Sequence, residues 1–370
     1  METSATGAAL DTPLAAAHLR AGTKMGAWFG CALPDDFGDP ASEYRASRDS
    51  LALIDKNYRA YLSFTGPDRV RYLNAILTNN IKDLSPGQGN VSLLLNPQGH
   101  ILAEIETYAF ADKLFCVSHA MIRERLIEWL DKYIIMDNVT LADESHRFAT
   151  LALEGPKAAA VVQELSGVDI IPLRDLTSID GAVDSIPCRI VKRSPAGIAG
   201  AEFIVQQENL AALWQVFLEV TRKHGGTPIG YSALSAIRLT QGVPWFGYDF
   251  GEKQIPHEAG LQDTHISYTK GCYTGQEIVE RVRSRGQVNR QRTGLIFTGD
   301  MVPEAGATLS LDAKELGYVT RAARIWDPPR VVGMGYVRKE GSVPGTVLHW
   351  AGGTATPAHF PETLQAISEA

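Results

Sequence analysis

The order of predicted elements in residues 59–149 constrains the fold of this chain more than any other feature. A β-rich run ending at Gly66 is followed by a helix-forming run that has Pro67 in its first turn. Three β-rich runs then lead into an amphipathic helix over 121–134, with Leu126 and Leu130 on one face. Strand, helix, strands, helix predicts a ferredoxin-like α+β layer. Residues 150–250 show a similar mixture of predicted strands and helices, so we expect an α+β fold with two such layers.

The composition changes near Arg292. From there to the C-terminal region the chain consists of short alternating or β-rich runs separated by glycine and proline. This pattern predicts a small antiparallel β-barrel or sandwich after the α+β part.

Charge and cysteine usage narrow the function classes. The net charge is −7, so no broad basic field indicates a nucleic-acid partner, and the basic density is confined to five arginines between Arg281 and Arg292. The four cysteines are scattered, without a C-x-x-C pair or a Cys/His pair at metal spacing, so we expect no disulfide framework, zinc site or cluster site. No apolar run is long enough to span a membrane and no secretory signal is visible, which favours a cytoplasmic location.

The stretch from Lys270 to Gly286, KGCYTGQEIVERVRSRG, has the strongest local pattern. Thr274 and Glu277 have capping-box spacing, which predicts a helix from Gly275 that ends at a left-handed Gly286. Cys272 would then lie before a helix N-terminus and near Lys270, and both features predict a thiol pKa below the usual value of about 8.5. The alternative is a simple turn with an inert thiol, because burial among apolar groups would oppose ionisation.

KGCYTGQE matches the signature of the YgfZ-like folate-binding proteins, which are relatives of the glycine-cleavage T-protein and support iron–sulfur cluster enzymes. Further resemblance to T-proteins runs from TPL at Thr12 through FG-x-x-LP, which ends at Pro34, to the GYVT and GMGYV runs near Val337. The resemblance implies a T-protein-like fold. It predicts a discontinuous folate-binding domain over 12–58 and 150–286, a second α+β domain over 59–149 and a β-barrel domain over 287–370.

The same resemblance implies a site for tetrahydrofolate or a one-carbon derivative. The run IRLTQGVPWFGYDF with IPHEAGL is similar to the folate-facing segment of T-proteins. It predicts that Arg238 faces the folate and its glutamate tail, that Asp249 is an acidic contact, and that Trp245, Phe246 and Tyr248 are walls. On residue types alone, Trp245 and Phe246 are better explained as core residues and Asp249 as a turn residue.

Other site residues follow from the two resemblances. The catalytic candidates are Cys272 and Lys270. The remaining predicted folate contacts are Glu258, Tyr273, Gln276, Glu277, Ser118 and Tyr58.

Departures from the T-protein pattern bear on the chemistry. Leu102 and Ala103 occupy the places of the acidic pair that supports aminomethyl transfer, and Ser118 occupies the place of an asparagine. A pterin-contacting carboxylate is missing or displaced to Glu202. Neither leucine nor alanine acts as a base, so we expect the transfer reaction to be disabled while part of the folate site survives.

Two functions remain open. The first is a folate-binding accessory protein for iron–sulfur enzymes or their assembly proteins, and through them for tRNA modification, with Cys272 as a functional thiol. The second is a folate-dependent aminomethyltransferase or demethylase whose acid is Asp249 or Glu258. A weaker third idea is tRNA contact through the arginines from Arg281 to Arg292.

Overall fold

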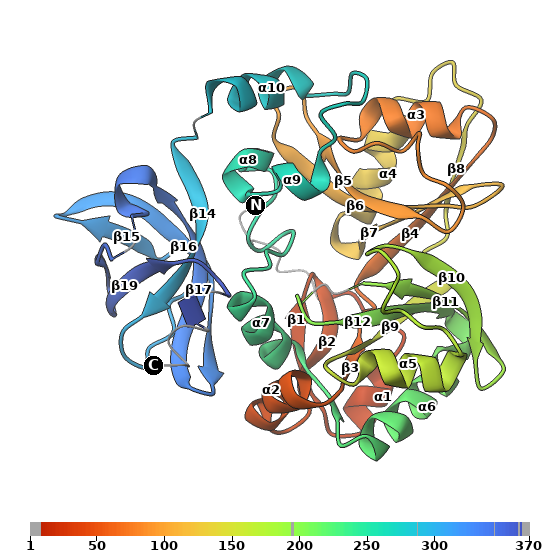
Figure 1. Ribbon diagram of the computed structural model, residues 1–370, viewed down its shortest axis with the longest axis horizontal. Coiled ribbons are helices and arrows are strands. Elements are labelled where there is room, and N and C mark those ends of the chain that lie inside the picture. The colour runs from red at the N-terminus through yellow and green to blue at the C-terminus, as the bar shows by residue number, and fades with distance from the viewer. Residues whose placement is uncertain (1–8, 194–195, 287, 344, 362, 365–370) are drawn as a thin grey trace.

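The computed structural model describes residues 9–193, 196–286, 288–343, 345–361 and 363–364. Figure 1 shows three parts: two α+β layers on the right, one above the other, and a β-barrel on the left. The predicted α+β class with a C-terminal barrel is confirmed, and the open choice between barrel and sandwich resolves to a closed barrel.

The lower layer in Figure 1 is a six-stranded sheet with the order β10-β11-β12-β9-β3-β13. All of its neighbours are antiparallel except the pair of β13 with β3. The elements of this layer are α1 Ala15–Arg20, β3 Ala52–Asp55, β9 Phe148–Glu154, α5 Ala158–Ser166, β10 Ser178–Val183, β11 Ile186–Lys192, β12 Gly200–Gln206, α6 Leu210–Lys223 and β13 Thr227–Pro228.

Alternation along the strands divides the two faces of this sheet. Leu151 and Leu153 of β9 pack into an apolar core with side chains of α5 and α6. Ala152 belongs to a different core on the opposite face, which also contains side chains of α7 and of the barrel. The inner face therefore points toward the centre of the molecule, where a site has to be assembled from several parts of the chain.

The upper layer is a five-stranded sheet with the order β5-β6-β7-β4-β8, built entirely from residues that lie between β3 and β9. Two helices pack on it, and both are shorter than the runs that the sequence suggested. The elements are β4 Arg59–Thr65, α3 Arg69–Ile76, β5 Gly89–Leu95, β6 Ile101–Ala109, β7 Leu114–His119, η1 Ala120–Ile122, α4 Arg123–Asp131 and β8 Thr140–Asp143.

The barrel closes in the order β14-β17-β16-β15-β18-β19. Its strands are β14 Arg290–Phe297, β15 Thr308–Leu311, β16 Lys314–Trp326, β17 Pro329–Arg338, β18 Leu348–Trp350 and β19 Gly353–Ala358. The remaining elements are β1 Lys24–Trp28, β2 Cys31–Asp36, α2 Pro40–Asp49, η2 Gln207–Asn209, α7 Tyr231–Thr240, α8 Pro256–Ala259, α9 Gln262–His265, α10 Gln276–Arg285 and η3 Lys339–Gly341. Within the described ranges, no helix is both long enough and apolar enough to cross a membrane.

Helix α7 lies between the barrel and the six-stranded layer (Figure 1), and Arg238 near its end is fully buried. The Arg238 guanidinium donates to the Asp249 carboxylate and, at 3.1 Å, to the carbonyl of Val243. Asp249 also accepts from Thr320 Oγ1 of β16 at 2.6 Å, and its backbone carbonyl accepts from the Tyr336 hydroxyl of β17 at 2.9 Å. This buried ion pair therefore joins α7 to the barrel.

We predict that Arg238→Ala lowers the free energy of unfolding by about 3–5 kcal/mol, because it leaves Asp249 charged and buried without its main partner. Urea titration followed by tryptophan fluorescence measures the change. Arg48→Ala is the matched control, because Arg48 pairs with Asp49 and Asp327 at the surface and such pairs contribute little. Equal losses in the two variants would contradict a structural role for the buried pair.

Candidate functional site

Strand β6 carries a row of acidic side chains toward the centre of the molecule. Ala103 and Ile105 point into the core beneath α3 and α4, so Leu102, Glu104 and Glu106 occupy the other face by alternation. Glu104 thus lies two residues along the same face from Leu102, the position where the resemblance led us to expect an acid.

Glu104 is held between two imidazole rings. Its Oε1 lies 3.0 Å from Nε2 of His265, and its Oε2 lies 3.4 Å from Nε2 of His119. Nδ1 of His265 lies 2.7 Å from the hydroxyl of Thr264. Burial acts to raise the pKa of the Glu104 carboxyl, but the hydrogen bonds to both histidines outweigh it and hold that pKa well below its usual range. Glu104 is therefore a charged carboxylate whose side chain stays 19% exposed.

Five aromatic rings gather next to this carboxylate, and we call Phe29, Tyr58, His119, Trp245 and Phe246 the central cluster. Phe29 stacks on Tyr58 with 4.1 Å between ring centroids, and its backbone has a left-handed φ of 52° at the turn between β1 and β2. The His119 ring lies 5.4 Å from that of Phe29 and 5.0 Å from that of Phe246. Its Nδ1 is buried and has no hydrogen-bond partner among the described residues.

The structure brings some of the predicted folate contacts to this centre. Tyr58, Trp245 and Phe246 belong to the central cluster, and the Ser118 hydroxyl donates to the backbone carbonyl of Glu104 at 2.8 Å. Tyr248 lies at the edge, where its hydroxyl accepts from the Phe29 N–H at 3.0 Å. These rings also pack against one another, so they form a core as well as walls.

Other side chains predicted to contact the folate are bonded to protein groups outside the central cluster. Arg238 is fully buried, its Cζ lies 4.6 Å from the centroid of the Trp245 ring, and its guanidinium pairs with Asp249. The guanidinium is therefore not accessible to a glutamate tail in this structure. Burial lowers the pKa of Arg238. Glu258 accepts from Nε of Arg290 at 3.0 Å, and Glu202 accepts from Nη2 of Arg59 at 2.7 Å.

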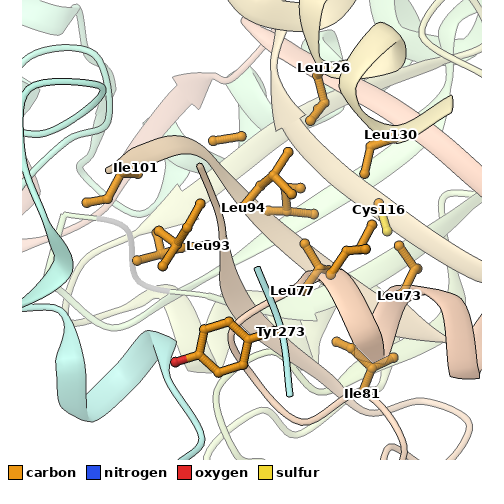
Figure 2. Close-up of a cluster of buried hydrophobic side chains, with 14 of the residues drawn as sticks. Leu73, Leu77, Ile81, Leu93, Leu94, Ile101, Cys116, Leu126, Leu130 and Tyr273 are labelled. Atoms are coloured by element: carbon orange, nitrogen blue, oxygen red, sulfur yellow. The ribbon is translucent and has the colours of Figure 1, made fainter. Parts of the chain in front are cut away.

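The loop from Lys270 to Gly275, which we call the motif loop, lies against the edge of the five-stranded sheet and not in the central cluster. Figure 2 shows Tyr273 among Leu77, Ile81 and Leu93, and the Tyr273 ring is 7% exposed. The ammonium group of Lys270 donates to the backbone carbonyls of Asn74 and Leu77 at the end of α3. Lys270 thus anchors the loop, and the expectation that its ammonium group serves the thiol is not supported by these contacts.

The predicted capping box is wrong. Helix α10 begins at Gln276, and Gly275 is its N-cap, with φ of 81° and no side-chain cap. A Cβ at Gly275 would come within 2.7 Å of the carbonyl oxygen of Asn96, so the close approach to the β5–β6 turn requires glycine. This turn places Thr274 outside the capping position, and Glu277 pairs with Arg281 at 2.6 Å instead. The left-handed Gly286 at the end of the helix is confirmed, with φ of 66°.

Cys272 differs from the other three cysteines in exposure. It is exposed on the motif loop, whereas Cys31, Cys116 and Cys188 are buried. Burial raises the thiol pKa of Cys31 to about 11, that of Cys116 to about 12 and that of Cys188 to about 11. Across the described residues, no cluster of three His, Cys, Asp or Glu side chains has the geometry to hold a metal ion.

The arginine run divides between surface and interior. Arg281, Arg283 and Arg285 lie on α10, where Arg283 stacks over the Tyr268 ring at 4.2 Å. Arg290 pairs with Glu258, and Arg292 donates to the backbone carbonyls of Ala259 and Gly242. Contact with tRNA stays a prediction, and its surface is limited to the three arginines of α10.

Comparison with known proteins identifies the family. The model of the GCVT N-terminal domain matches residues 14–268, well over half of the chain. The chain belongs to this family. It is similar to an aminomethyltransferase from Streptomyces avermitilis, with 26% identity over 338 residues that cover 90% of this chain and 91% of the relative. An aminomethyltransferase from Herpetosiphon aurantiacus is 29% identical over 312 residues, which cover 84% and 85% of the two chains.

The fold of this GCVT family member matches a solved aminomethyltransferase. The crystal structure of the glycine cleavage system aminomethyltransferase T from Bartonella henselae superposes with a TM-score of 0.86 over 95% of this chain and 98% of that one, at 24% identity. The T-protein part of the predicted resemblance is therefore confirmed. The YgfZ-like part and the iron–sulfur role stay predictions.

Sequence reasoning missed the Glu104, His119 and His265 group. The signal for Glu104 was present, because a carboxylate two positions after Leu102 in a strand shares its face. His119 directly follows Ser118, a residue that the resemblance did select. His265 had no signal, because 161 residues separate it from Glu104 and only the folded chain joins them.

Lys270 provides a pH-dependent test of the anchored loop. Burial lowers the Lys270 pKa from 10.5 to about 8. Between these values the unfolded chain binds more protons than the folded protein, so the Lys270 contribution to stability rises with pH. We predict that the wild type gains stability relative to Lys270→Met between pH 8 and 10.5, as measured by urea unfolding. A flat difference, or the same trend for the exposed Lys82→Met control, would refute this assignment.

Proposed function

We propose that this protein binds a reduced folate, either tetrahydrofolate or a one-carbon derivative, at the central cluster and works in folate-dependent one-carbon chemistry. Membership of the GCVT family and the relatives named aminomethyltransferase support this class of function. The observation that carries the proposal is the Glu104 carboxylate beside the central cluster. Flat rings and an interior acceptor suit a pterin, which has flat faces and adjacent N–H donors.

The residues of the centre have definite roles in this proposal. Glu104 accepts hydrogen bonds from ligand N–H groups, and the two histidines hold its carboxylate in place. Tyr58 and Trp245 offer ring faces. Because Phe29 fills the space against Tyr58, binding requires these rings to move, and the Trp245 environment changes with them.

The transfer reaction itself is expected to be weak. Leu102 leaves no acid at the position of the T-protein acidic pair. Glu104 lies two residues further along the strand and is already bonded to two imidazoles. We therefore expect folate binding with little or no aminomethyl transfer. Robust formation of methylenetetrahydrofolate from glycine with the other glycine-cleavage components would overturn this expectation and favour a full transferase.

We predict that tetrahydrofolate quenches the tryptophan fluorescence of the wild type and that Glu104→Gln weakens its binding about tenfold or more. Loss of a charge-assisted hydrogen bond accounts for a change of this size. Titrations with tetrahydrofolate, its formyl and methylene forms, and folic acid measure the affinities and the one-carbon preference. Glu128→Gln, an exposed change on α4, is the control and should bind as the wild type does.

The proposal fails if no reduced folate binds at millimolar concentration. It also fails in its site assignment if Glu104→Gln and Glu128→Gln bind equally well, because the carboxylate would then lie outside the binding site.

A second candidate function is favoured by the exposure of Cys272. We propose that the protein also fits an accessory role for iron–sulfur enzymes, in which this thiol contacts the client enzyme or an assembly protein. The anchored loop supports the role, since Lys270 is bonded to the end of α3 and Tyr273 is packed in the core, while the thiol between them faces solvent. Gln276 and Glu277 begin α10 next to it.

We predict that iodoacetamide labels one cysteine of the native protein and that Cys272→Ser removes the label, because the other three thiols are buried and protonated. In cells that lack the endogenous relative, Cys272→Ser should fail to restore iron–sulfur enzyme activity, whereas Thr274→Ser in the same loop should restore it. Full restoration by Cys272→Ser would make the thiol dispensable and leave the folate site as the functional centre.

A further inference from the structure

A cavity of about 350 Å³ lies where the β1–β2 hairpin, α7 and strand β16 of the barrel meet. Its lining includes Trp28 and Asp35 from the hairpin, Ser235 from α7, and Arg321 and Trp326 from β16. None of the five rings of the central cluster belongs to the lining, so the cavity is separate from the proposed folate site. We propose that this cavity binds a free α-amino acid with an apolar side chain.

Arg321 supplies a cation that is free to bind a ligand. Its Cζ lies 4.6 Å from the centroid of the Trp28 ring and 5.3 Å from that of the Tyr248 ring, so two aromatic rings hold the guanidinium in place. Among the described residues the guanidinium has neither a carboxylate partner nor a hydrogen-bond acceptor. Arg324, the other arginine of the lining, already pairs with Asp300 at 3.0 Å. The site therefore suits one carboxylate, which a guanidinium binds through two parallel hydrogen bonds.

Ser235 adds a hydroxyl without a partner at the α7 wall of the cavity. The residue is 2% exposed, and its Oγ is buried with no hydrogen-bond partner in the part of the chain that the structure describes. Buried polar groups in proteins are nearly always hydrogen-bonded. Because Ser235 lines the cavity, its hydroxyl can donate to the carboxylate of a ligand.

The β1–β2 hairpin supplies a carboxylate that already binds an alkylammonium group. Nζ of Lys24 lies 2.8 Å from Oδ2 of Asp35 and 3.4 Å from Oδ2 of Asp36. The Lys24 side chain is 68% exposed, so this pair is weak in water and the ammonium group of a ligand can replace that of Lys24. Oδ1 of Asp35 accepts from Ser232 Oγ at 2.8 Å and from Trp28 Nε1 at 3.3 Å, and these bonds hold the carboxylate in place.

Trp28 connects the cation to the carboxylate. The Arg321 guanidinium lies over the Trp28 ring, and the indole N–H of the same ring donates to Asp35, so both charged groups border one side chain. A small zwitterion matches this arrangement, with its carboxylate on Arg321 and its ammonium group on Asp35. Apolar walls come from Pro40, Ala322, Ala323 and Trp326. These walls favour a zwitterion that carries an apolar side chain.

Calorimetric titration of the full chain tests the proposal. The probe is L-leucine, and its matched analogues are 4-methylpentanoate, which lacks the ammonium group, and 3-methylbutylamine, which lacks the carboxylate. The wild type should bind leucine about tenfold more tightly than either analogue, because each analogue leaves one charged group of the cavity without a ligand partner.

Two variants locate the site. Arg321→Gln should weaken leucine binding about tenfold. Arg338→Gln, at an exposed position of β17 outside the lining, is the charge-matched control and should bind as the wild type does. Ser235→Ala should weaken leucine binding about threefold without loss of stability in urea unfolding, because it removes a hydroxyl that has no partner among the described residues.

Three results would overturn the proposal. The first is that leucine does not bind to the wild type at millimolar concentration. The second is that either analogue binds as tightly as leucine, because the site would then recognise one charge and not a zwitterion. The third is equal leucine binding by Arg321→Gln and Arg338→Gln, which would place the ligand elsewhere. Each of these results leaves the proposed folate function standing, because tetrahydrofolate titration of Glu104→Gln tests that function separately.

Discussion

The relative position of the two α+β layers depends on one buried guanidinium. Arg59 at the start of β4 donates to Glu106 within its own sheet and to Glu202 of β12 in the other sheet. Arg193 from the second layer donates to Glu106 at 3.0 Å and completes the connection. Carboxylates buried this deeply remain charged only when cations lie against them, so the layers cannot separate without exposing unpaired charge. This fixed spacing sets the width of the space in which the central cluster forms.

The barrel is attached by the same kind of interaction. Arg238 and Asp249 form a fully buried pair that α7 and the barrel share, and Arg292 extends it with hydrogen bonds to two backbone carbonyls. Three bodies thus meet around the aromatic rings, each held by an arginine whose charge is satisfied inside the protein. A cation that holds the structure in this way is not free to bind an anionic ligand. Arg281, Arg283 and Arg285 on the surface of α10 are among the arginines that remain exposed.

In the motif loop, Cys272 is held at the surface because neighbouring residues of the loop are anchored to the rest of the protein. Lys270 donates to two carbonyls at the end of α3, Tyr273 packs into the core below β5, and Gly275 permits close contact with the β5–β6 turn. Cys272 lies between these anchors and stays at the surface. The comparisons show the fold and the family of this chain, whereas the functional role of this loop stays a prediction.

The sequence by itself determined the features that depend on neighbouring residues. Periodicity predicted the α+β layers and the β-rich C-terminal part, and glycine at 286 predicted the end of α10, because strand alternation and left-handed turns are local properties. Sequence resemblance also identified the superfamily. Tertiary structure alone decided which charges pair. Arg238 forms an ion pair with Asp249, and Lys270 donates to backbone carbonyls almost 200 residues away. Glu104 is hydrogen-bonded to His265, which is 161 residues away along the chain. The role of a charged side chain depends on its burial and on its long-range partners. Neither can be predicted from the residues next to it in the sequence, because both depend on parts of the chain that only folding brings together.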